Sequence, residues 1–409
     1  MSGRPPEQDL ETYPVGGYVR DQLLGRQPTD RDWVVVGSTV ADMLARGFQQ
    51  VGRDFPVFLH PQSKEEYALA RGRDPAGGLR TSPDITLEED LARRDLTINA
   101  MAMDIDGRLI DPFHGAQDLA QGILRHLPAF TDDPLRILRL ARFSAQLGFS
   151  ITGETIKLAR SMVAKGSLLT LPPERIWQEL LRALRSPSPR RFIEVLRELH
   201  ALQVILPEVD ALFGIPQPEK YHPEIDTGIH ILMALDQATA LTEDPLVRFA
   251  VLAHDLGKAA TPPEYWPSHR GHEALGVPLV DQLCRRLRVP GHYQKLARKT
   301  SRYHLMVHLA FELKPKTLAK LLDDLDAWRS PEDFERFLIA CQADAQGRGG
   351  LQEQPYPQAD FLRQIHALTK DISAKDVSGN FTGKQIGVEI HQLRCRKIAT
   401  FKKHHAKTR

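Results

Sequence analysis

The stretch VGGYVRDQLLGRQPTDRDWVVVG, residues 15–37, decides how the rest of this chain is interpreted. It begins with a Gly-Gly turn and a short helix start, and it ends in the β-branched run Val34–Val36, which predicts a strand. Successive side chains of a strand point to opposite faces, so we expect Asp30 and Asp32 to project together as the chain enters this run. Two carboxylates held that close repel each other, and a divalent cation such as Mg²⁺, which prefers oxygen ligands, explains them best. The alternative is a solvated turn that happens to carry two aspartates.

The same stretch is typical of a site for metal-dependent phosphoryl transfer. Glycine has no Cβ, so backbone N–H groups near Gly17 can approach phosphate oxygens closely, and Arg20 follows within reach as a phosphate partner. Metal ions held by Asp30 and Asp32 would lower the pKa of an attacking hydroxyl and stabilise a departing pyrophosphate. Such sites usually have a third carboxylate, and Glu66, on a neighbouring predicted strand, is our candidate. The alternative is that Glu66 is only an exposed strand acid.

Composition excludes little, but the distribution of residues is informative. With 409 residues we expect more than one domain, and the hydrophobic fraction of 42% is ordinary for soluble protein. The net charge of +2 identifies no partner, whereas residues 384–409 contain eight Lys and Arg against the single acid Glu389. Such an end suits a phosphate backbone, or it is simply solvated. The three cysteines are too widely spaced for a metal cluster or a disulfide framework, and no stretch predicts a signal region or a membrane span. We therefore expect a soluble cytoplasmic protein.

The pattern of elements changes along the chain. Residues 1–14 are polar and contain proline, so we expect a loose extension. We then expect strands at 34–36, 55–59, 66–70 and 109–111, helices at 41–45 and 88–102, a hairpin turn at 60–64, and a flexible loop at 71–78. After Asp133-Pro134 the pattern is almost wholly helical. The predicted organisation is an α/β head at 15–132, a helical neck and body at 133–220, a helical domain with several histidines at 221–330, and a helical tail with a basic end at 331–409.

Four ordered blocks make this chain similar to a known family. The blocks are residues 15–37, Arg93–Ala100 (RRDLTINA), Asp111–Gly115 (DPFHG) with Asp118-Leu119, and Asp133–Phe143 (DPLRILRLARF). Together they resemble the tRNA nucleotidyltransferases that build the terminal CCA, of the bacterial class II kind, and the similarity continues to about Arg348. The resemblance implies a nucleotidyltransferase head of the polymerase-β-like type, followed by an all-α neck, body, HD domain and tail.

The resemblance also implies roles for single residues. It makes Asp30 and Asp32 the metal ligands, and it places around the incoming nucleotide Gly17, Arg20, Arg94, Asp95, Asp133, Arg136, Arg139 and Arg142. Asp133 and Arg136 would read the Watson–Crick edges of C and A. Residues three apart lie along one side of a helix, so Arg136, Arg139 and Arg142 share a face. Without the other blocks, such a stripe would be interpreted as a solvated basic face.

A second cluster of chemistry-bearing residues comes later in the chain. It consists of His222–His230, His254-Asp255 and His269–His272. His254 and Asp255 are adjacent on one helix turn, and we expect neighbouring helices to bring in the other histidines. Such groups can bind one or two divalent metals and hydrolyse a phosphoester, although a single His-Asp pair is usually structural. The cluster resembles the HD phosphohydrolase superfamily, which implies 2′,3′-cyclic phosphodiesterase, 2′-nucleotidase and phosphatase activity, often with Ni²⁺. The implied ligands are His230, His254, Asp255 and His272. The last ligand stays open, because His304 is followed by Leu305 and not by a carboxylate.

Three functions are compatible with these motifs. The first is an enzyme, monomeric or homodimeric, that adds C, C and A to tRNA 3′ ends from CTP and ATP without a template, with a secondary HD hydrolase. The second is a poly(A) polymerase, which shares the head motifs; the histidine region and the lack of a long basic N-terminal extension argue against it. The third is an RNA-binding protein with a decayed head. Against that stand four intact residues, which are Asp30, Asp32, Arg94 and Arg136.

Overall fold

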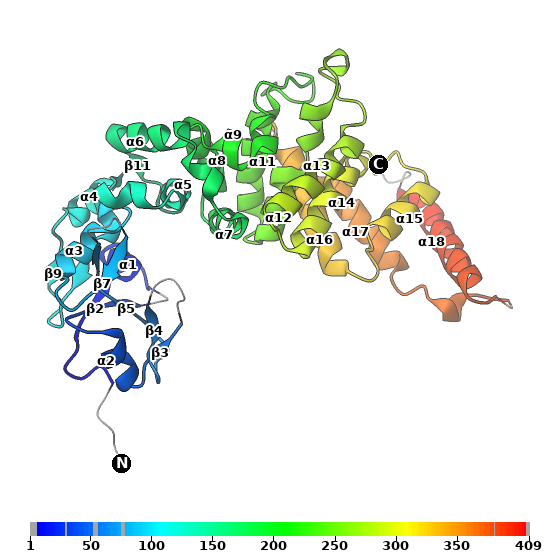
Figure 1. The fold of residues 1–409 in the computed structure, drawn as a ribbon. Helices are drawn as coiled ribbons and strands as arrows, with labels where there is room; N and C mark the ends of the chain where they lie inside the picture. The colour runs from blue at the N-terminus through cyan, green and yellow to red at the C-terminus, as the bar shows by residue number, and fades with distance from the viewer. Residues whose placement is uncertain (1–5, 29–30, 52–55, 75–77, 380, 406–409) are drawn as a thin grey trace. The chain divides into compact units, whose positions relative to one another are not determined.

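The computed structural model describes residues 6–28, 31–51, 56–74, 78–379 and 381–405. The chain divides into two compact units, residues 1–170 and residues 171–409. The first unit contains a sheet with helices, and the second is helical (Figure 1), as the sequence predicted. The finer five-part division of the chain stays a prediction.

A seven-stranded sheet organises the first unit, with the strand order β3-β4-β5-β2-β1-β8-β9. Its strands are β1 (Glu11–Val15), β2 (Asp32–Val36), β3 (Gln49–Gln50), β4 (Val57–Leu59), β5 (Glu66–Leu69), β8 (Ala102–Met103) and β9 (Leu109–Ile110). The neighbours β2 and β5 run parallel, and all other neighbours run antiparallel. The predicted strands at 34–36, 66–70 and 109–111 are confirmed, as is the hairpin turn between β4 and β5.

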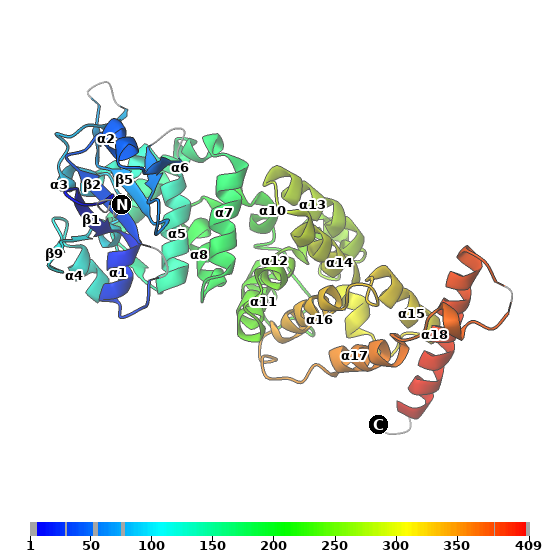
Figure 2. The same cartoon turned by 90° about the horizontal axis from the view of Figure 1, so that it is seen from below.

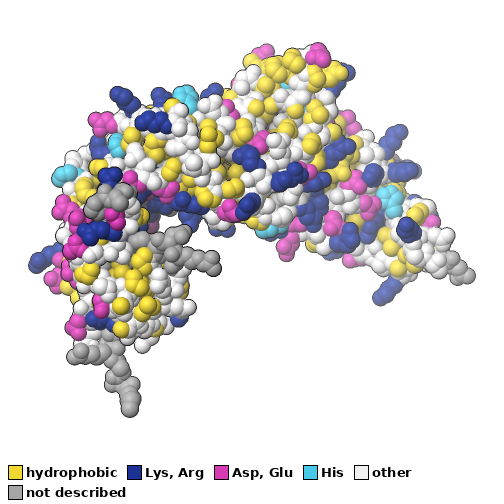
Figure 3. Space-filling view, in the orientation of Figure 1, with side chains coloured by type: hydrophobic (Ala, Val, Ile, Leu, Met, Phe, Trp, Pro, Cys, Tyr) yellow, Lys and Arg dark blue, Asp and Glu magenta, His cyan; other side chains and the backbone are white. Residues whose placement is uncertain are grey.

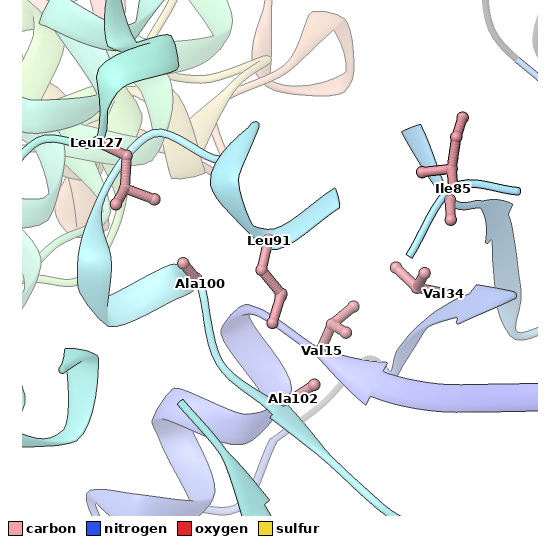
Figure 4. Packing of buried hydrophobic residues seen from close by; sticks show 8 residues of the cluster. Val15, Val34, Ile85, Leu91, Ala100, Ala102 and Leu127 are labelled. Carbon is pink, nitrogen blue, oxygen red and sulfur yellow. The ribbon is translucent and has the colours of Figure 1, made fainter. Parts of the chain in front are cut away.

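The central strand β2 is buried on both faces. Val34 and Val35 are each 1% exposed, and because they are successive residues they enter different core clusters. Val34 packs with Val15 and Ala102 on one face (Figure 4), and Val35 packs in a cluster with Met43, Phe48, Phe58, Tyr67 and Leu69 on the other. Burying a valine side chain of this kind contributes about 1.5–3 kcal/mol, so β2 is firmly held, and the residues at its start are positioned by the sheet.

The described residues of the first unit form six α-helices, and two of these helices begin with a capping box. They are α1 (Gly17–Leu23), α2 (Val40–Ala45), α3 (Leu87–Ala92), α4 (Gly115–Gln121), α5 (Leu135–Leu147) and α6 (Gly153–Ala164). Thr39 caps α2 and Thr86 caps α3, each through a capping box in which the threonine and an acid three residues later satisfy backbone N–H groups. The short strands β10 (Ile123–Leu124) and β11 (Ser150–Ile151) pair in parallel. The predicted helix at 41–45 is confirmed.

Three local predictions are wrong. The loose extension predicted to reach residue 14 ends earlier, because Glu11–Val15 forms β1 and pairs along its whole length with β2. The loop predicted at 71–78 contains strand β6 (Arg71–Arg73), which pairs with β7 (Leu79–Thr81). Gly72 allows close packing there, since a Cβ would lie 3.1 Å from the Ile85 side chain.

The single helix predicted at 88–102 is the third wrong prediction. Helix α3 ends at Ala92, and a 3₁₀ turn at Thr97–Asn99 and strand β8 follow. The Asp95 carboxylate accepts a hydrogen bond from the backbone N–H of Leu96 at 2.9 Å. Short polar side chains that bond the local backbone in this way compete with the helix ladder, which is why helical propensity does not decide this segment.

The described residues of the second unit form helices and no sheet. They are α7 (Pro173–Leu184), α8 (Pro189–Glu198), α9 (Leu202–Ile205), α10 (Pro207–Asp210), α11 (Thr227–Leu241), α12 (Pro245–Ala253), α13 (His272–Arg286), α14 (Gly291–His308), α15 (Pro315–Asp324), α16 (Pro331–Gln346), α17 (Pro357–Thr369) and α18 (Lys384–His405). Many start at proline, whose missing N–H is not needed in the first helical turn. Helices α11, α12, α14 and α16 pack against one another (Figure 2). Among the helices described, none combines the length and hydropathy that a membrane span needs.

Candidate functional site

Two acidic side chains predicted to be catalytic lie side by side in the first unit. The parallel register of β2 and β5 pairs Asp32 with Glu66. Both line a pocket of about 540 Å³, together with Tyr18 and Arg31. Exposed carboxylates on adjacent strands are a donor set that suits Mg²⁺. Asp30 lies outside the described residues, so its place at this pocket stays a prediction.

The backbone conformation before α1 requires glycine at position 16. Gly16 has φ +66° and ψ −122°, a combination that side-chain-bearing residues rarely adopt, and a Cβ there would lie 2.6 Å from Arg94 Nη1. Gly17 begins α1, and Arg20 on the next turn is 5% exposed. The Arg20 guanidinium donates to Asn99 Oδ1 at 2.7 Å. The turn thus lets three segments of the chain meet at the predicted triphosphate site.

Asp95 is buried and forms an ion pair with Arg139, whose side chain is 33% exposed, and this pair joins the network. Arg139 Nε donates to Asp95 Oδ2 at 2.7 Å, and the Asn99 amide donates to Asp95 Oδ1 at 2.9 Å. Burial favours the neutral form of Asp95, but the charge of Arg139 and the hydrogen bond from Asn99 outweigh it and lower its pKa to about 2. Arg20, Asn99, Asp95 and Arg139 therefore form one connected chain of contacts. Asn99 was not predicted as a site residue, although it belongs to the RRDLTINA block.

The two residues predicted to read the base are engaged with backbone groups. Arg136 donates to the carbonyl oxygen of Arg93 at 2.6 Å and to that of Arg94 at 3.2 Å. Asp133 Oδ1 accepts the backbone N–H of Leu135 at 3.0 Å, at the start of α5. A base edge would have to exchange with these bonds in order to contact Asp133 and Arg136.

The arginine stripe of α5 packs against other residues of the first unit and is only partly exposed to solvent. The Phe143 ring lies beneath the guanidinium groups of Arg20, Arg139 and Arg142, at 5.2, 5.5 and 4.0 Å from its centroid. Arg142 is only 8% exposed. Arginine stacked on an aromatic face is held in a defined orientation by the ring's quadrupole. The stripe is therefore part of the predicted nucleotide site, and a solvated basic face does not describe it.

The predicted HD ligands converge in the second unit. His230 lies on α11, His254 and Asp255 follow α12, and His272 begins α13. Asp255 Oδ2 lies 3.2 Å from His254 Nε2 and 3.8 Å from His230 Nε2, and Asp255 Oδ1 lies 3.2 Å from His272 Nε2. All four side chains are buried. The structure thus brings together every residue that the sequence proposed for this centre.

Two further residues complete the centre. Asp344 on α16 places Oδ1 3.1 Å from His230 Nε2 and 3.6 Å from His254 Nε2. His304 on α14 places Nε2 3.6 Å from Asp255 Oδ1. The carboxylate that the sequence left open is therefore Asp344. No spacing rule indicates it, because only the packing of α16 against α11 and α12 brings it there.

The donor atoms of this centre fit a divalent metal ion. His254 Nε2 and Asp255 Oδ1 are buried and lack a hydrogen-bond partner of good geometry among the described residues. Unpartnered buried polar atoms are costly unless another group satisfies them. Burial opposes a charge on His254, but Asp255 and Asp344 outweigh it and raise its pKa to about 10. The same two carboxylates would favour a divalent cation, and mixed imidazole and carboxylate donors suit transition metals.

Glu224 orients His230 from outside the centre. Its Oε1 lies 3.1 Å from His230 Nδ1 and 2.9 Å from His222 Nδ1, and its Oε2 accepts the backbone N–H of Gly349. A histidine whose Nδ1–H donates a hydrogen bond to a carboxylate presents Nε2 to a metal in a fixed direction. His222 and Glu224 belong to the segment His222–His230, but the sequence analysis assigned no role to either residue.

Comparisons with known proteins identify the family to which the chain belongs. The family model described as "Poly A polymerase head domain" matches residues 12–125, "Probable RNA and SrmB- binding site of polymerase A" matches 148–213, and "HD domain" matches 227–328. The Multifunctional CCA protein of Hahella chejuensis is 54% identical over 97% of each chain. That of Thioalkalivibrio sulfidiphilus is 55% identical, over 96% of this chain and 99% of its own. The chain belongs to the multifunctional CCA protein family.

Solved structures show the same fold. A Bacillus stearothermophilus CCA-adding enzyme in complex with CTP aligns with a TM-score of 0.64 at 22% identity, over 99% of each chain. A CCA-adding enzyme in apo form I aligns with a TM-score of 0.65 at 21% identity, over 96% of this chain and 87% of that chain. The resemblance of the four sequence blocks to CCA-adding nucleotidyltransferases is confirmed. At these identities the structures support the fold, and the family assignment rests on the closer sequences.

Proposed function

We propose that this chain adds C, C and A to the 3′ end of tRNA from CTP and ATP, without a nucleic-acid template, and releases pyrophosphate. The observation that carries this function is the 54–55% identity to multifunctional CCA proteins along nearly the whole chain. Two matching family models are named after poly A polymerase. The multifunctional CCA proteins, however, match 96–97% of the chain and so cover the head and the HD region together. A poly(A) polymerase is therefore not favoured.

The nucleotidyl transfer site is assigned to the pocket at the starts of β2 and β5. Asp32 and Glu66, with Asp30, would hold Mg²⁺, which when bound lowers the pKa of the tRNA 3′-hydroxyl and stabilises the pyrophosphate leaving group. Arg20 and Arg94 meet beside the Gly-Gly turn, where cations and backbone N–H groups can hold a triphosphate. The contacts among Arg20, Asn99 and Asp95 keep these groups in place before the nucleotide arrives.

Base selection is assigned to Asp133 and Arg136. An aspartate offers acceptors and an arginine offers donors in a rigid plane, so together they can pair with the edge of C or A without a template. Both side chains already hold backbone partners. A base that satisfies both side chains offsets the loss of those bonds, whereas a base that fits poorly leaves buried polar groups unpaired.

We assign a second, hydrolytic activity to the histidine centre. Its six residues are His230, His254, Asp255, His272, His304 and Asp344. A divalent transition metal such as Ni²⁺ would supply an activated water for hydrolysis of 2′,3′-cyclic phosphates, 2′-nucleotides and phosphomonoesters. The imidazole-rich donor set supports a transition metal over Mg²⁺, which prefers oxygen ligands.

We assign binding of the tRNA acceptor arm and elbow to the helical parts of the chain. Figure 3 shows Lys and Arg side chains among acidic ones over the visible surface. Helix α18 carries Lys384, Arg394, Arg396, Lys397, Lys402 and Lys403. Contacts of this kind neutralise phosphates and recognise RNA by its shape. tRNA as substrate and the reduced, widely spaced cysteines support a cytoplasmic location.

An incorporation assay tests the first activity. The protein is incubated with Mg²⁺, a tRNA that lacks CCA, and labelled CTP or ATP, singly and together. Addition that stops after three nucleotides supports CCA addition, long A tracts would support a poly(A) polymerase, and no incorporation would support an RNA-binding protein with a decayed head.

Two substitutions separate the activities. Asp32→Ala is expected to abolish incorporation and to leave Ni²⁺-dependent hydrolysis of 2′,3′-cyclic AMP intact. His254→Ala is expected to do the reverse, so each variant is the folding control for the other. If Asp32→Ala kept full incorporation, the metal assignment at β2 would be wrong.

A further inference from the structure

His308 lies directly behind Asp344 and is not among the donors of the histidine centre. It is the last residue of α14, and its Nε2 lies 2.7 Å from Asp344 Oδ2. Its Nδ1 lies 2.7 Å from the hydroxyl of Tyr356, the residue that precedes α17. Tyr356 is 9% exposed. Three residues from separate helical segments therefore form one line of hydrogen bonds that ends at a proposed metal ligand.

The contacts of a neutral His308 are satisfied by one tautomer. A carboxylate only accepts, so His308 Nε2 must carry the proton that bonds to Asp344. The neutral form of His308 then accepts at Nδ1, and the Tyr356 hydroxyl donates there. Burial raises the pKa of Tyr356, which keeps that hydroxyl protonated. The line runs from Tyr356 through His308 to Asp344, with every donor and acceptor matched.

The two oxygens of Asp344 are divided between two neighbourhoods. Oδ2 accepts from His308, while Oδ1 faces His230 Nε2 at 3.1 Å and His254 Nε2 at 3.6 Å. Oδ1 also lies 3.6 Å from Arg348 Nη2, which is a competing cation. Without a donor at Oδ2, the carboxylate would carry an unpaired buried acceptor and could turn toward Arg348.

We propose that His308, held by Tyr356, is a positioning residue that fixes the Asp344 carboxylate so that Oδ1 points at the His230–His254 pair. This inference rests on the proposed metal-dependent function of the histidine centre. His308 would not bind the metal itself, because its Nε2 is committed to the oxygen on the other side of Asp344. Outer partners of this kind typically alter metal affinity by about 10- to 100-fold when removed.

Metal binding by the full chain tests the proposal without an activity assay. Ni²⁺ affinity is measured by calorimetry, and the Co²⁺ absorption spectrum reports ligand geometry, for His308→Ala, His308→Gln and Tyr356→Phe. His308→Ala is expected to weaken Ni²⁺ binding about 10- to 100-fold and to change the Co²⁺ spectrum. His308→Gln is expected to restore most of the affinity, because its amide N–H can still donate to Asp344. His391→Ala, which removes a partly exposed histidine paired with Asp323, is the control and should bind as the unaltered chain does.

Tyr356→Phe keeps the ring and removes only the hydroxyl that holds His308. It is expected to weaken Ni²⁺ binding about 2- to 10-fold, the value of one hydrogen bond, even if His308→Ala fails to fold. Unchanged affinity and spectrum in both His308→Ala and Tyr356→Phe would overturn the positioning role while leaving the metal centre intact. Failure of the unaltered chain to bind Ni²⁺ or Co²⁺ would overturn the proposed hydrolytic function as well.

Discussion

Replacing Asp95 by Asn is expected to destabilise the first unit by about 2 kcal/mol at pH 7. Asp95 is 4% exposed, and its carboxylate pairs with Arg139. The pKa of Asp95 is lowered from 3.8 to about 2, and each pKa unit corresponds to about 1.4 kcal/mol. Asn has the shape of Asp and keeps one side-chain oxygen, so the hydrogen bond from the Asn99 amide can persist. The loss of stability therefore comes chiefly from the loss of the negative charge.

The predicted loss depends on pH in a defined direction. A carboxyl whose folded-state pKa is depressed stabilises the fold above its unfolded-state value, near pH 4, and this contribution disappears as the pH falls toward 2. The difference between the unaltered chain and Asp95→Asn should therefore shrink to about half at pH 3.

The measurement must report on the first unit alone. Urea titrations at pH 7 and pH 3 are read by hydrogen exchange of peptides from residues 90–103, because a global probe would mix the unfolding of two units. Asp106→Asn, at an exposed carboxylate, is the control and should change stability by less than about 0.5 kcal/mol. A loss below about 0.5 kcal/mol for Asp95→Asn at pH 7, or an equal loss at both pH values, would refute the reasoning.

Three further outcomes are expected. Gly16→Ala should lower the free energy of unfolding of the first unit by about 1–3 kcal/mol, by the same urea titration, since φ is +66° and the new Cβ meets Arg94. Gly257→Ala should weaken Ni²⁺ binding in calorimetry, because its Cβ would lie 2.0 Å from the carbonyl oxygen of His272. The control is Gly291→Ala, which has open space around the new Cβ and should leave Ni²⁺ binding unchanged. Ni²⁺ at roughly 100 times its Kd should stabilise the second unit by about 2.7 kcal/mol in a denaturant titration, and a chelator should reverse this. Equal stability with and without Ni²⁺ would contradict the metal assignment.

The elements with strong local patterns could be predicted from sequence. The run Val34–Val36 predicted a strand because β-branched residues bounded by turn signals fit a buried sheet, and β2 occupies that place. The prediction of one helix at 88–102 was wrong. The pattern of charged and apolar residues did not show that the Asp95 side chain points inward and bonds the Leu96 N–H and Arg139. Its side-chain contacts, and not its propensity, set the end of α3.

For the two candidate sites, the sequence by itself indicated the short motifs in which chemistry-bearing residues gather. The Gly-Gly turn, the carboxylates near β2, the arginines of α5 and the His-Asp pair each lie within a short motif, and a motif encodes local backbone geometry. Only the tertiary structure decided which of them meet. The register of β2 with β5 placed Glu66 beside Asp32, and the packing of α14 and α16 placed His308 and Asp344 at the histidine centre. Strand register and helix packing depend on the burial of distant apolar faces, so no local pattern around residue 344 could indicate its partners near residues 230 and 254.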